Sequence, residues 1–217
     1  AATIRRLKPT RVIIVFDGKG GSNRRKSVYK GYKEGRTGLT KLNRLAGYED
    51  LEDQRVSMRN QFKRLIEYLQ ILPITMTYID YVEADDIIAY LANHYFEKQV
   101  TILSSDKDFL QLVNHRIQVY TPTKKKMYTE TEVKEDFGVS AQNLIFYRVL
   151  MGDKSDNIKG VNGVGIKTIE SKMKFLTENH LSLDTFIEKC SKECDEKLSK
   201  KLMDNLDTIN MNYGLME

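Results

Sequence analysis

Val82-Glu83-Ala84-Asp85-Asp86 is the stretch around which the rest of the chain is organised, because it places three carboxylates within four residues. No Lys or Arg occurs between residues 71 and 96 to neutralise them. The chain carries a net charge of +5, so the acidic cluster stands out against a basic background. A divalent metal ion is the direct way to compensate such a group. Two further acidic pairs follow, Asp106/Asp108 and Asp153/Asp156.

Short apolar runs alternate with helical patterns on both sides of this stretch, which predicts an α/β fold with a mostly parallel central sheet and helices on both faces. The β-branched run 11–16 is typical of a buried strand. The expected strands are 11–16, 74–79, 100–103 and 117–120. The expected helices are 1–7, 56–72, 84–96, 109–113, 131–137 and 140–152. The side chains expected to face inward are Met58, Phe62, Leu65, Ile66, Leu69 and Leu72 on one helix and Ile87, Ile88, Leu91 and Tyr95 on another.

Acidic residues follow successive strands of this predicted sheet. Because parallel strands end at the same edge, these side chains are expected to converge there. Asp153 and Asp156 share one face if their turn is helical. Taken singly, such acids more often cap helices or form turns, and that interpretation stays open for each of them. The predicted ligands of Mg²⁺ or Mn²⁺ are Asp17, Glu83, Asp85, Asp86, Asp106, Asp108, Asp153 and Asp156.

Residues 20–55 form a basic, Gly-containing segment with interleaved tyrosines. Positive charge is concentrated at the front of the chain, where residues 1–36 hold eleven Lys or Arg and two acids. Such a segment favours single-stranded nucleic acid, with cations on phosphates and rings on bases. The alternative is a mobile solvated loop. The candidate contacts include Arg24, Arg25, Lys26, Tyr29 and Tyr32.

The stretch 159–169 carries three glycines in six positions and opens a helix. Together with the helix before it, this turn predicts a helix–hairpin–helix at about 144–176 that grips duplex phosphates without reading sequence. A nucleotide-binding P-loop is excluded because the turn lacks the Gly-Lys-Ser/Thr motif and follows no strand. An ordinary capped helix turn is the alternative. The residues concerned are Lys159, Gly160, Gly163, Gly165, Lys167 and Thr168.

Two cysteines without a nearby histidine are too few for a zinc site and are typical of a reduced, cytoplasmic protein. No apolar run approaches the length of a membrane span. The expected division is an α/β nuclease core over 1–128 and a helical region over 129–217 that contains the hairpin.

The strings VEADD, LSSDKDFLQLV and LMGDKSDNIKGVNGVGIKT, with VFDGKG and YKEGR before them, resemble the 5′-nuclease family. This family includes flap endonucleases, phage 5′-3′ exonucleases and the 5′-nuclease domain of bacterial DNA polymerases. The resemblance implies a PIN-like core with a metal-dependent nuclease site that cuts DNA at single-strand/duplex junctions. It implies two or more Mg²⁺ or Mn²⁺ ions at the eight acids, and K⁺ at the hairpin.

The resemblance also assigns roles to the basic segment. Lys33 and Arg36 match basic residues that stabilise charge on the scissile phosphate, Tyr32 matches a neighbouring aromatic, and Asp17 matches an acid of the catalytic centre. Residues 20–55 correspond to the arch that clamps the 5′ strand. The implied partners are flapped, forked or nicked DNA and RNA/DNA hybrids, bound by a monomer.

The family's pattern begins with a strand that ends in Ile-Asp-Gly, and no such strand precedes residue 11 here. This difference predicts that the chain lacks an N-terminal strand and one carboxylate. Two functions are therefore considered besides a complete nuclease. One is a catalytically impaired, structure-specific DNA-binding module, and the other is a metal-dependent phosphatase, which the basic segment and the hairpin argue against.

Overall fold

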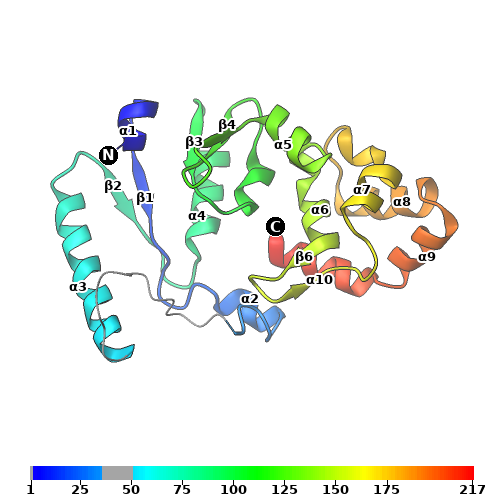
Figure 1. Cartoon of the computed structure of the whole chain (residues 1–217), viewed down its shortest axis with the longest axis horizontal. Coiled ribbons are helices and arrows are strands. Elements are labelled where there is room, and N and C mark those ends of the chain that lie inside the picture. Colours follow the sequence, from blue (N-terminus) through cyan, green and yellow to red (C-terminus); the bar gives the residue numbers. More distant parts are fainter. Residues whose placement is uncertain (1, 36–50) are drawn as a thin grey trace.

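The structure, a computed structural model, describes residues 2–35 and 51–217. Its strands form two parallel pairs that are not hydrogen-bonded to each other (Figure 1). In the first, β1 (Ile13–Val15) pairs with β2 (Thr75–Thr77). In the second, β3 (Val100–Leu103) pairs with β4 (Ile117–Thr121), and β5 (Lys126–Tyr128) is added antiparallel to β4. The expected α/β architecture with mostly parallel strands is confirmed, although the described sheet is in two sections and β5 was not predicted.

Helices surround the strands and dominate the second half of the chain. The helix α3 lies at one end of the molecule, and α7, α8 and α9 lie at the other (Figure 1). A short hairpin of β6 (Gly152–Asp153) and β7 (Ile158–Lys159) follows α6. The helices are α1 (Ala2–Leu7), α2 (Asn23–Val28), α3 (Leu51–Gln70), α4 (Ala84–Tyr90), α5 (Glu130–Phe137), α6 (Leu144–Met151), α7 (Ile166–Lys172), α8 (Leu183–Glu193), α9 (Glu196–Met203) and α10 (Leu206–Met216), with the shorter turns η1 (Leu91–Tyr95), η2 (Asp108–Leu112), η3 (Ala141–Asn143) and η4 (Lys174–Thr177).

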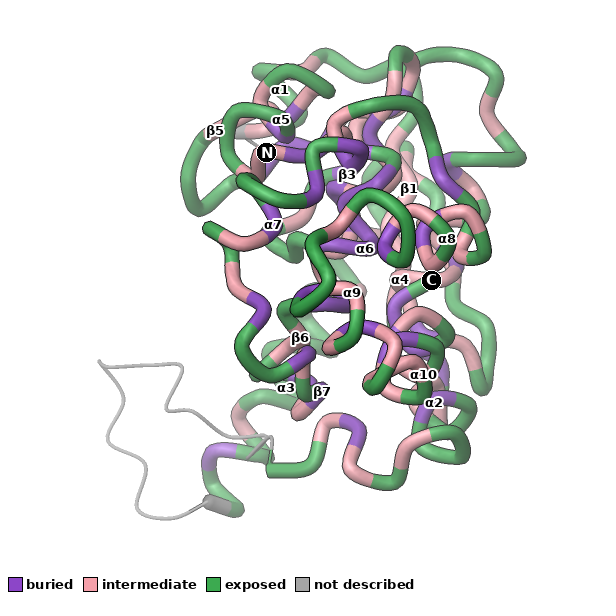
Figure 2. The backbone as a smooth tube through the Cα atoms, turned by 90° about the vertical axis from the view of Figure 1, so that its right-hand side faces the viewer, coloured by how far each residue is buried: buried purple, intermediate pink, exposed green. Residues whose placement is uncertain are grey.

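The core is centred on α6, which is buried along most of its length (Figure 2). Leu144, Phe146 and Leu150 are each fully buried, and Phe146 stacks on Phe186 of α8 with ring centroids 4.2 Å apart. Asn212 of α10 is also fully buried, and its amide donates to the carbonyl oxygens of Val149 and Lys159. This core therefore fixes α6, the β6–β7 hairpin and α10 in one orientation, and the pocket described below depends on that orientation.

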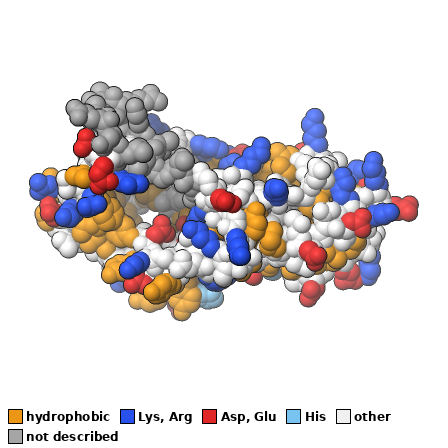
Figure 3. All heavy atoms as spheres, turned by 90° about the horizontal axis from the view of Figure 1, so that it is seen from below, with side chains coloured by type: hydrophobic (Ala, Val, Ile, Leu, Met, Phe, Trp, Pro, Cys, Tyr) orange, Lys and Arg blue, Asp and Glu red, His pale blue; other side chains and the backbone are white. Residues whose placement is uncertain are grey.

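The helix α3 differs from its prediction. Its apolar stripe was expected to face inward, yet Phe62 is 52% exposed and Leu65 is 46% exposed. Hydrophobic side chains gather on the surface at this end of the molecule (Figure 3). One contact to the strands is the edge-to-face pair of Phe62 with Phe16, at 5.6 Å between centroids. Helical periodicity identifies a helix and an apolar face, but it does not show that a neighbour covers that face.

Two local predictions near the helix ends are also wrong. Tyr95, expected to face inward, is 61% exposed, because the helix ends in the π-helical turn η1. The carbonyl oxygens of that turn are satisfied by the guanidinium of Arg116, which lies just before β4. The helix expected over 140–152 begins only at Leu144, and before it the Ser140 hydroxyl, which could have capped that helix, is buried without a hydrogen-bond partner among the described residues. Within the described residues, no helix is long and apolar enough to cross a membrane.

Candidate active site

One pocket of about 250 Å³ collects seven of the eight predicted acids. Their side chains come from three places in the chain: the start of α4, the turn between β3 and η2, and the β6–β7 hairpin. Three cationic groups also line the pocket, Arg25, Lys33 and Arg148. The acids are Glu83, Asp85, Asp86, Asp106, Asp108, Asp153 and Asp156. The prediction that these separate clusters meet in space agrees with the structure.

Arg25 on α2 neutralises the first cluster. Its guanidinium donates to Glu83 Oε2 at 2.7 Å and to both carboxylate oxygens of Asp86 at 2.7 and 2.9 Å. Its Nε donates to the carbonyl oxygen of Leu215 on α10 at 2.9 Å. Only 8% of Arg25 is exposed, and its pKa is raised, because the favourable carboxylates outweigh the effect of burial. Arg25 therefore ties α2, α4 and α10 together at the pocket wall.

Lys33 and Tyr32 reach the same carboxylate from the loop after α2. The Lys33 ammonium lies 2.5 Å from Glu83 Oε1, and the Tyr32 hydroxyl donates to Glu83 Oε2 at 3.2 Å. Lys33 has a left-handed backbone, with φ of 57°, and its amide donates to the carbonyl oxygen of Asp156 at 2.9 Å. Such strain persists where the surroundings fix the residue, and here it aims the ammonium into the pocket. Burial and the charges of Asp156 and Glu83 raise the pKa of Tyr32, so its phenol is the proton donor.

Arg148 on α6 neutralises the third cluster. Its guanidinium lies 2.7 Å from Asp153 Oδ2 and also pairs with Asp108. The other oxygen of Asp153 accepts from the amide and the hydroxyl of Ser155 at 2.6 and 2.7 Å. Burial alone raises the pKa of Asp153, but these hydrogen bonds and Arg148 outweigh it and lower the pKa below its usual range. The sequence reasoning missed Arg148; its position five residues before Asp153 on a predicted helix was the available signal.

Asp85 and Asp108 are the two carboxyl groups of the pocket whose pKa values are raised most clearly. Burial, together with the charge of Asp106, raises the pKa of Asp85 to about 6. Burial likewise raises the pKa of Asp108 to about 6, although Arg148 acts against this shift. Within the described parts of the chain, no three His, Cys, Asp or Glu side chains are already arranged around a common ion position. With Glu217, which also lines the pocket, eight acidic side chains nonetheless exceed the three cations by five formal charges when all are ionised, and oxygen donors suit Mg²⁺ or Mn²⁺. The residues therefore fit divalent ions in composition and charge.

These two carboxyl groups predict an unusual pH dependence of stability. Their folded pKa values lie above the unfolded value of 3.8, so the folded state holds their protons more tightly. That contribution is complete below pH 3.8 and is lost as the pH rises through about 6. In EDTA, we expect the free energy of unfolding to fall between pH 5 and 7.5 by about 1–2 kcal/mol, a figure discounted for the exposure of Asp85. Urea unfolding at each pH measures it.

The Asp85→Asn, Asp108→Asn double variant is the matched control, because it removes both titrating groups and should flatten this slope. Carboxylates with lowered pKa values, such as Asp153 and Asp136, lose their contribution only at more acidic pH, outside the tested window. A parent protein that gains stability from pH 5 to 7.5 would contradict the assignment.

Several predicted site residues lie elsewhere. Asp17 lies beside the pocket without lining it, and its Oδ1 accepts from the amide of Ala84 at 2.8 Å, at the start of α4. Arg25 and Tyr32 were expected among exposed nucleic-acid contacts, but both are buried and bind Glu83, so neither is retained as a DNA contact. Arg24 and Lys26 are exposed on α2, and Tyr29 is partly buried against the core. Arg36 and part of the predicted arch, 36–50, lie outside the described residues.

The predicted helix–hairpin–helix is present as α6, the β6–β7 hairpin, a glycine turn and α7. Gly160 lies so close to α6 that a Cβ there would be 2.3 Å from the carbonyl oxygen of Leu150. Gly163 has φ of 73° and Gly165 precedes the first turn of α7. Lys159 and Lys167 are exposed, and the amide of Thr168 donates to the carbonyl oxygen of Gly165. The turn thus keeps its glycines for close packing and a left-handed backbone and presents lysines to solvent.

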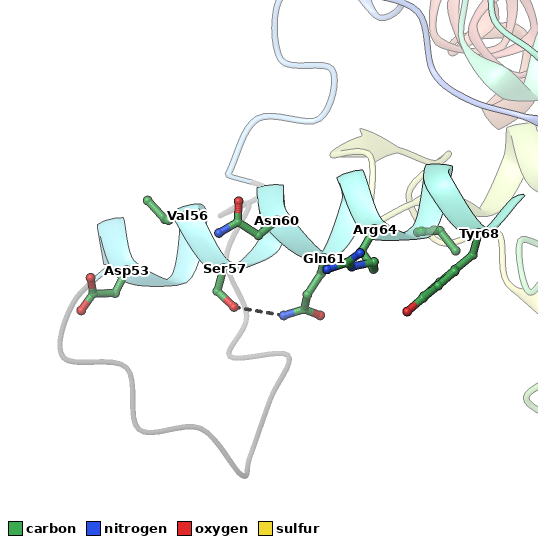
Figure 4. Close-up of a pocket in the computed structure, with 8 residues that line it drawn as sticks. Asp53, Val56, Ser57, Asn60, Gln61, Arg64 and Tyr68 are labelled. Carbon is green, nitrogen blue, oxygen red and sulfur yellow. Dashed lines mark hydrogen bonds between the residues drawn. The ribbon is translucent and has the colours of Figure 1, made fainter. Parts of the chain in front are cut away.

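A second hollow lies on α3 (Figure 4). Its lining residues all belong to this helix, among them Ser57, Gln61 and Tyr68, and Gln61 donates to the Ser57 hydroxyl at 3.1 Å. Asp53 is its one acid. Its lining holds no cluster of acids among the described residues, so the acidic pocket is the candidate active site.

Two family models together match the whole chain. The first, described as the 5′-3′ exonuclease N-terminal resolvase-like domain, matches residues 1–138, and the second, the 5′-3′ exonuclease C-terminal SAM fold, matches residues 139–217. The chain belongs to the 5′-3′ exonuclease family. The models divide the chain ten residues after the predicted division at 128/129. The resemblance inferred from the acidic strings is confirmed.

Individual members of this 5′-3′ exonuclease family show the same likeness. The chain is 34% identical over 205 residues to a flap endonuclease Xni of Pseudoalteromonas translucida, covering 92% of the chain and 70% of that protein. It is 33% identical over 173 residues to a 5′-3′ exonuclease of Aquifex aeolicus, covering 79% of the chain and 54% of that protein, so the match spans about half of the relative's length. The T5 D15 protein, co-crystallised with metal ions, shares the fold with a TM-score of 0.75 at 22% identity, covering 99% of this chain and 77% of the T5 chain.

Proposed function

We propose that this chain is a divalent-metal-dependent 5′-3′ exonuclease and flap endonuclease that hydrolyses DNA phosphodiesters at single-strand/duplex junctions. The observation that carries the proposal is the pocket in which seven carboxylates from three chain segments face one another. Membership of the 5′-3′ exonuclease family supports it, as do relatives described as a 5′-3′ exonuclease and a flap endonuclease. A T5 flap endonuclease complex that contains DNA and metal ions shares the fold.

The carboxylates would hold two or more Mg²⁺ or Mn²⁺ ions. Asp85 and Asp106 are the best placed, because they face each other's charge and, among the described residues, neither is paired with a cation. Bound ions of this kind lower the pKa of a water and neutralise the leaving oxygen in phosphodiester hydrolysis. Glu83, Asp108 and Asp153 would join them where the ions replace the cations that these groups now contact.

Lys33 is the second part of the proposed chemistry. Its ammonium reaches Glu83 from a fixed left-handed backbone, so a modest side-chain rotation brings it to a phosphate held at the acids. There it would stabilise the negative charge that develops on the phosphate oxygens. Arg36 is proposed for the same role by its match to the family pattern. Arg148, half-buried behind Asp153 and Asp108, instead orients both carboxylates and favours their ionised forms.

The remaining contacts are proposed to bind DNA on either side of the pocket. Arg24, Lys26 and Tyr29 on and after α2 would meet the single strand, and the exposed Lys159 and Lys167 of the hairpin would meet duplex phosphates. Bound K⁺ at the glycine turn, activity on RNA/DNA hybrids, a monomeric state and a cytoplasmic location stay predictions.

A 5′-flap substrate labelled at both ends tests the proposal when it is incubated with Mg²⁺ or Mn²⁺, with EDTA as the control. We expect metal-dependent cleavage near the junction. Tight binding of the flap without cleavage in either metal would favour the structure-specific binding module instead. Hydrolysis of a small phosphomonoester with no action on the flap would favour a phosphatase.

The hairpin gives a separate prediction. We expect Lys167→Ala to weaken binding of a blunt DNA duplex and to reduce the slope of log Kd against log salt by about one, the share of a single phosphate contact. Fluorescence anisotropy in EDTA measures the Kd and its salt slope. Salt concentrations of about 50 to 200 mM suffice, because phosphate contacts change the affinity strongly over this range. Lys174→Ala, an exposed lysine of η4, is the matched control and should leave the slope unchanged. An unchanged slope in Lys167→Ala would remove this residue from the interface.

A further inference from the structure

Tyr81 has a backbone conformation that a tyrosine rarely adopts. It lies in the turn between β2 and α4, where the amide of Val82 donates to the carbonyl oxygen of Ile79 at 3.2 Å. Its φ is 66°, in the left-handed region. The third position of a turn closed in this way is where glycine is ordinarily required, and a side chain there costs about 1–2 kcal/mol.

The neighbouring loop holds Tyr81 in this conformation. The Tyr81 amide donates to the carbonyl oxygen of Lys19 at 2.9 Å, and the amide of Gly18 donates to the carbonyl oxygen of Val82 at 3.2 Å. Gly18 lies so close to the turn that a Cβ there would be 1.8 Å from the carbonyl oxygen of Ile79. Two backbone segments thus interlock, and the backbone of Tyr81, from which its ring projects, is fixed relative to the loop that leads into α2.

Packing does not compensate for this strain. Tyr81 is 67% exposed. Its ring lies beside Gly20, where an added Cβ would lie 3.2 Å from the ring. An aromatic ring with most of its surface in water contributes little to stability. A glycine would form the same turn at lower cost, so the ring is maintained for something outside the fold.

The position of Tyr81 identifies its partner. It stands two residues before Glu83, which lines the acidic pocket, and two residues span roughly 7 Å of chain. The loop against which it packs carries the exposed Lys19 and continues to the exposed Arg24. An exposed ring that projects from a held backbone, beside a loop that carries cations, is an arrangement on which single-stranded nucleic acids stack their bases.

We propose that the Tyr81 ring is a stacking platform for an unpaired nucleobase of the strand whose phosphate enters the acidic pocket. This inference rests on the proposed nuclease function. The contact would orient the strand at the pocket without reading its sequence, because every base has a face that can stack. Tyr81 is a positioning residue in this arrangement, since its ring contacts the substrate away from the reacting atoms.

The proposal is tested with the parent protein, Tyr81→Gly and Tyr81→Phe. Each is given two substrates, a duplex with a 5′ unpaired extension and the same duplex with blunt ends. The unpaired nucleotide at the junction is 2-aminopurine, whose fluorescence is quenched on stacking, and binding is measured in EDTA. We expect Tyr81→Gly to bind the extended substrate about 5- to 100-fold more weakly, without quenching, and the blunt duplex equally well. Tyr81→Phe should match the parent within about twofold, because it keeps the ring.

Loss of the fold does not confuse this test, because Tyr81→Gly relieves the backbone strain and should resist urea at least as well as the parent. Parent-like binding and quenching by Tyr81→Gly would overturn the stacking role while the nuclease function stands. Equal weakening on both substrates would assign Tyr81 to loop structure and overturn the proposal as well. Failure of the parent to bind either DNA would overturn the proposed function and the stacking role together.

Discussion

Arg25→Ala is expected to lower the free energy of unfolding by about 3–5 kcal/mol, which is the usual cost of removing one partner from a buried ion pair. The substitution leaves Glu83, with only 4% of its surface exposed, and Asp86 without the guanidinium that binds both. It also removes the hydrogen bond from α2 to the carbonyl oxygen of Leu215 on α10. Urea unfolding at pH 7.5 in EDTA measures the change.

Arg24→Ala is the matched control, because Arg24 is the preceding residue of α2 but is exposed, and its loss should change stability by less than about 0.5 kcal/mol. Arg25→Lys should lie between the two, since one ammonium cannot donate to Asp86 through two nitrogens and to Leu215 as well. If Arg25→Ala were as stable as Arg24→Ala, the carboxylates would have to be neutralised in some other way.

Much of the site could be predicted because it depends on local pattern. The strand at 100–103 and the acids after the strand ends could be predicted from residue type and spacing, and those at 83–86 and 106–108 meet as parallel strands require, whereas Asp17 lies beside the pocket. The helix expected over 131–137 is likewise present as α5, and Gly138 ends it with a φ of 68°.

The counter-charge of Glu83 and Asp86 could not be predicted, because it depends on contacts far apart in the sequence. Arg25 and Glu83 are 58 residues apart, and nothing in the basic segment distinguishes Arg25 from the exposed Arg24. The sequence reasoning therefore treated the acids as unneutralised and Arg25 as a DNA contact. Arg148 lies five residues before Asp153 on a helix whose other residues are apolar or aromatic, so the pattern of that helix predicts packing and not an ion pair. Which cation meets which acid is a tertiary property, whereas the convergence of the acids follows from strand order.

The pairing pattern also decides which acid gives the cleanest test of catalysis. Asp153 is a poor choice, because its carboxylate organises the turn through Ser155 and holds Arg148, so its removal would disturb structure and metal binding together. Asp85 has no hydrogen bond or ion pair to another described side chain. Burial and the charge of Asp106 raise its pKa. Its charge is therefore a cost to the fold in the absence of metal.

We expect Asp85→Asn to lower flap cleavage in Mg²⁺ by at least about 10²–10³-fold, because an amide oxygen is a weaker ligand for a divalent ion and removes one negative charge from the pocket. The same change should raise the free energy of unfolding in EDTA at pH 7.5, where the parent carboxyl is ionised. DNA binding in EDTA should stay within a few fold of the parent. Cleavage, urea unfolding and anisotropy measure the three effects.

Opposite signs for stability and activity are the distinctive part of this expectation. If the carboxylate stabilises the fold, replacing it with an amide lowers both the stability and the cleavage rate of the protein. If it is kept for metal binding, the same replacement raises the stability while it lowers the cleavage rate. Asp184→Asn, an exposed acid in the first turn of α8, is the matched control and should change neither quantity. An active Asp85→Asn would exclude Asp85 as a metal ligand, and an inactive but destabilised one would show that its carboxylate supports the fold. If the excess negative charge of the pocket serves to bind divalent ions, Asp85→Asn must be both inactive and more stable than the parent.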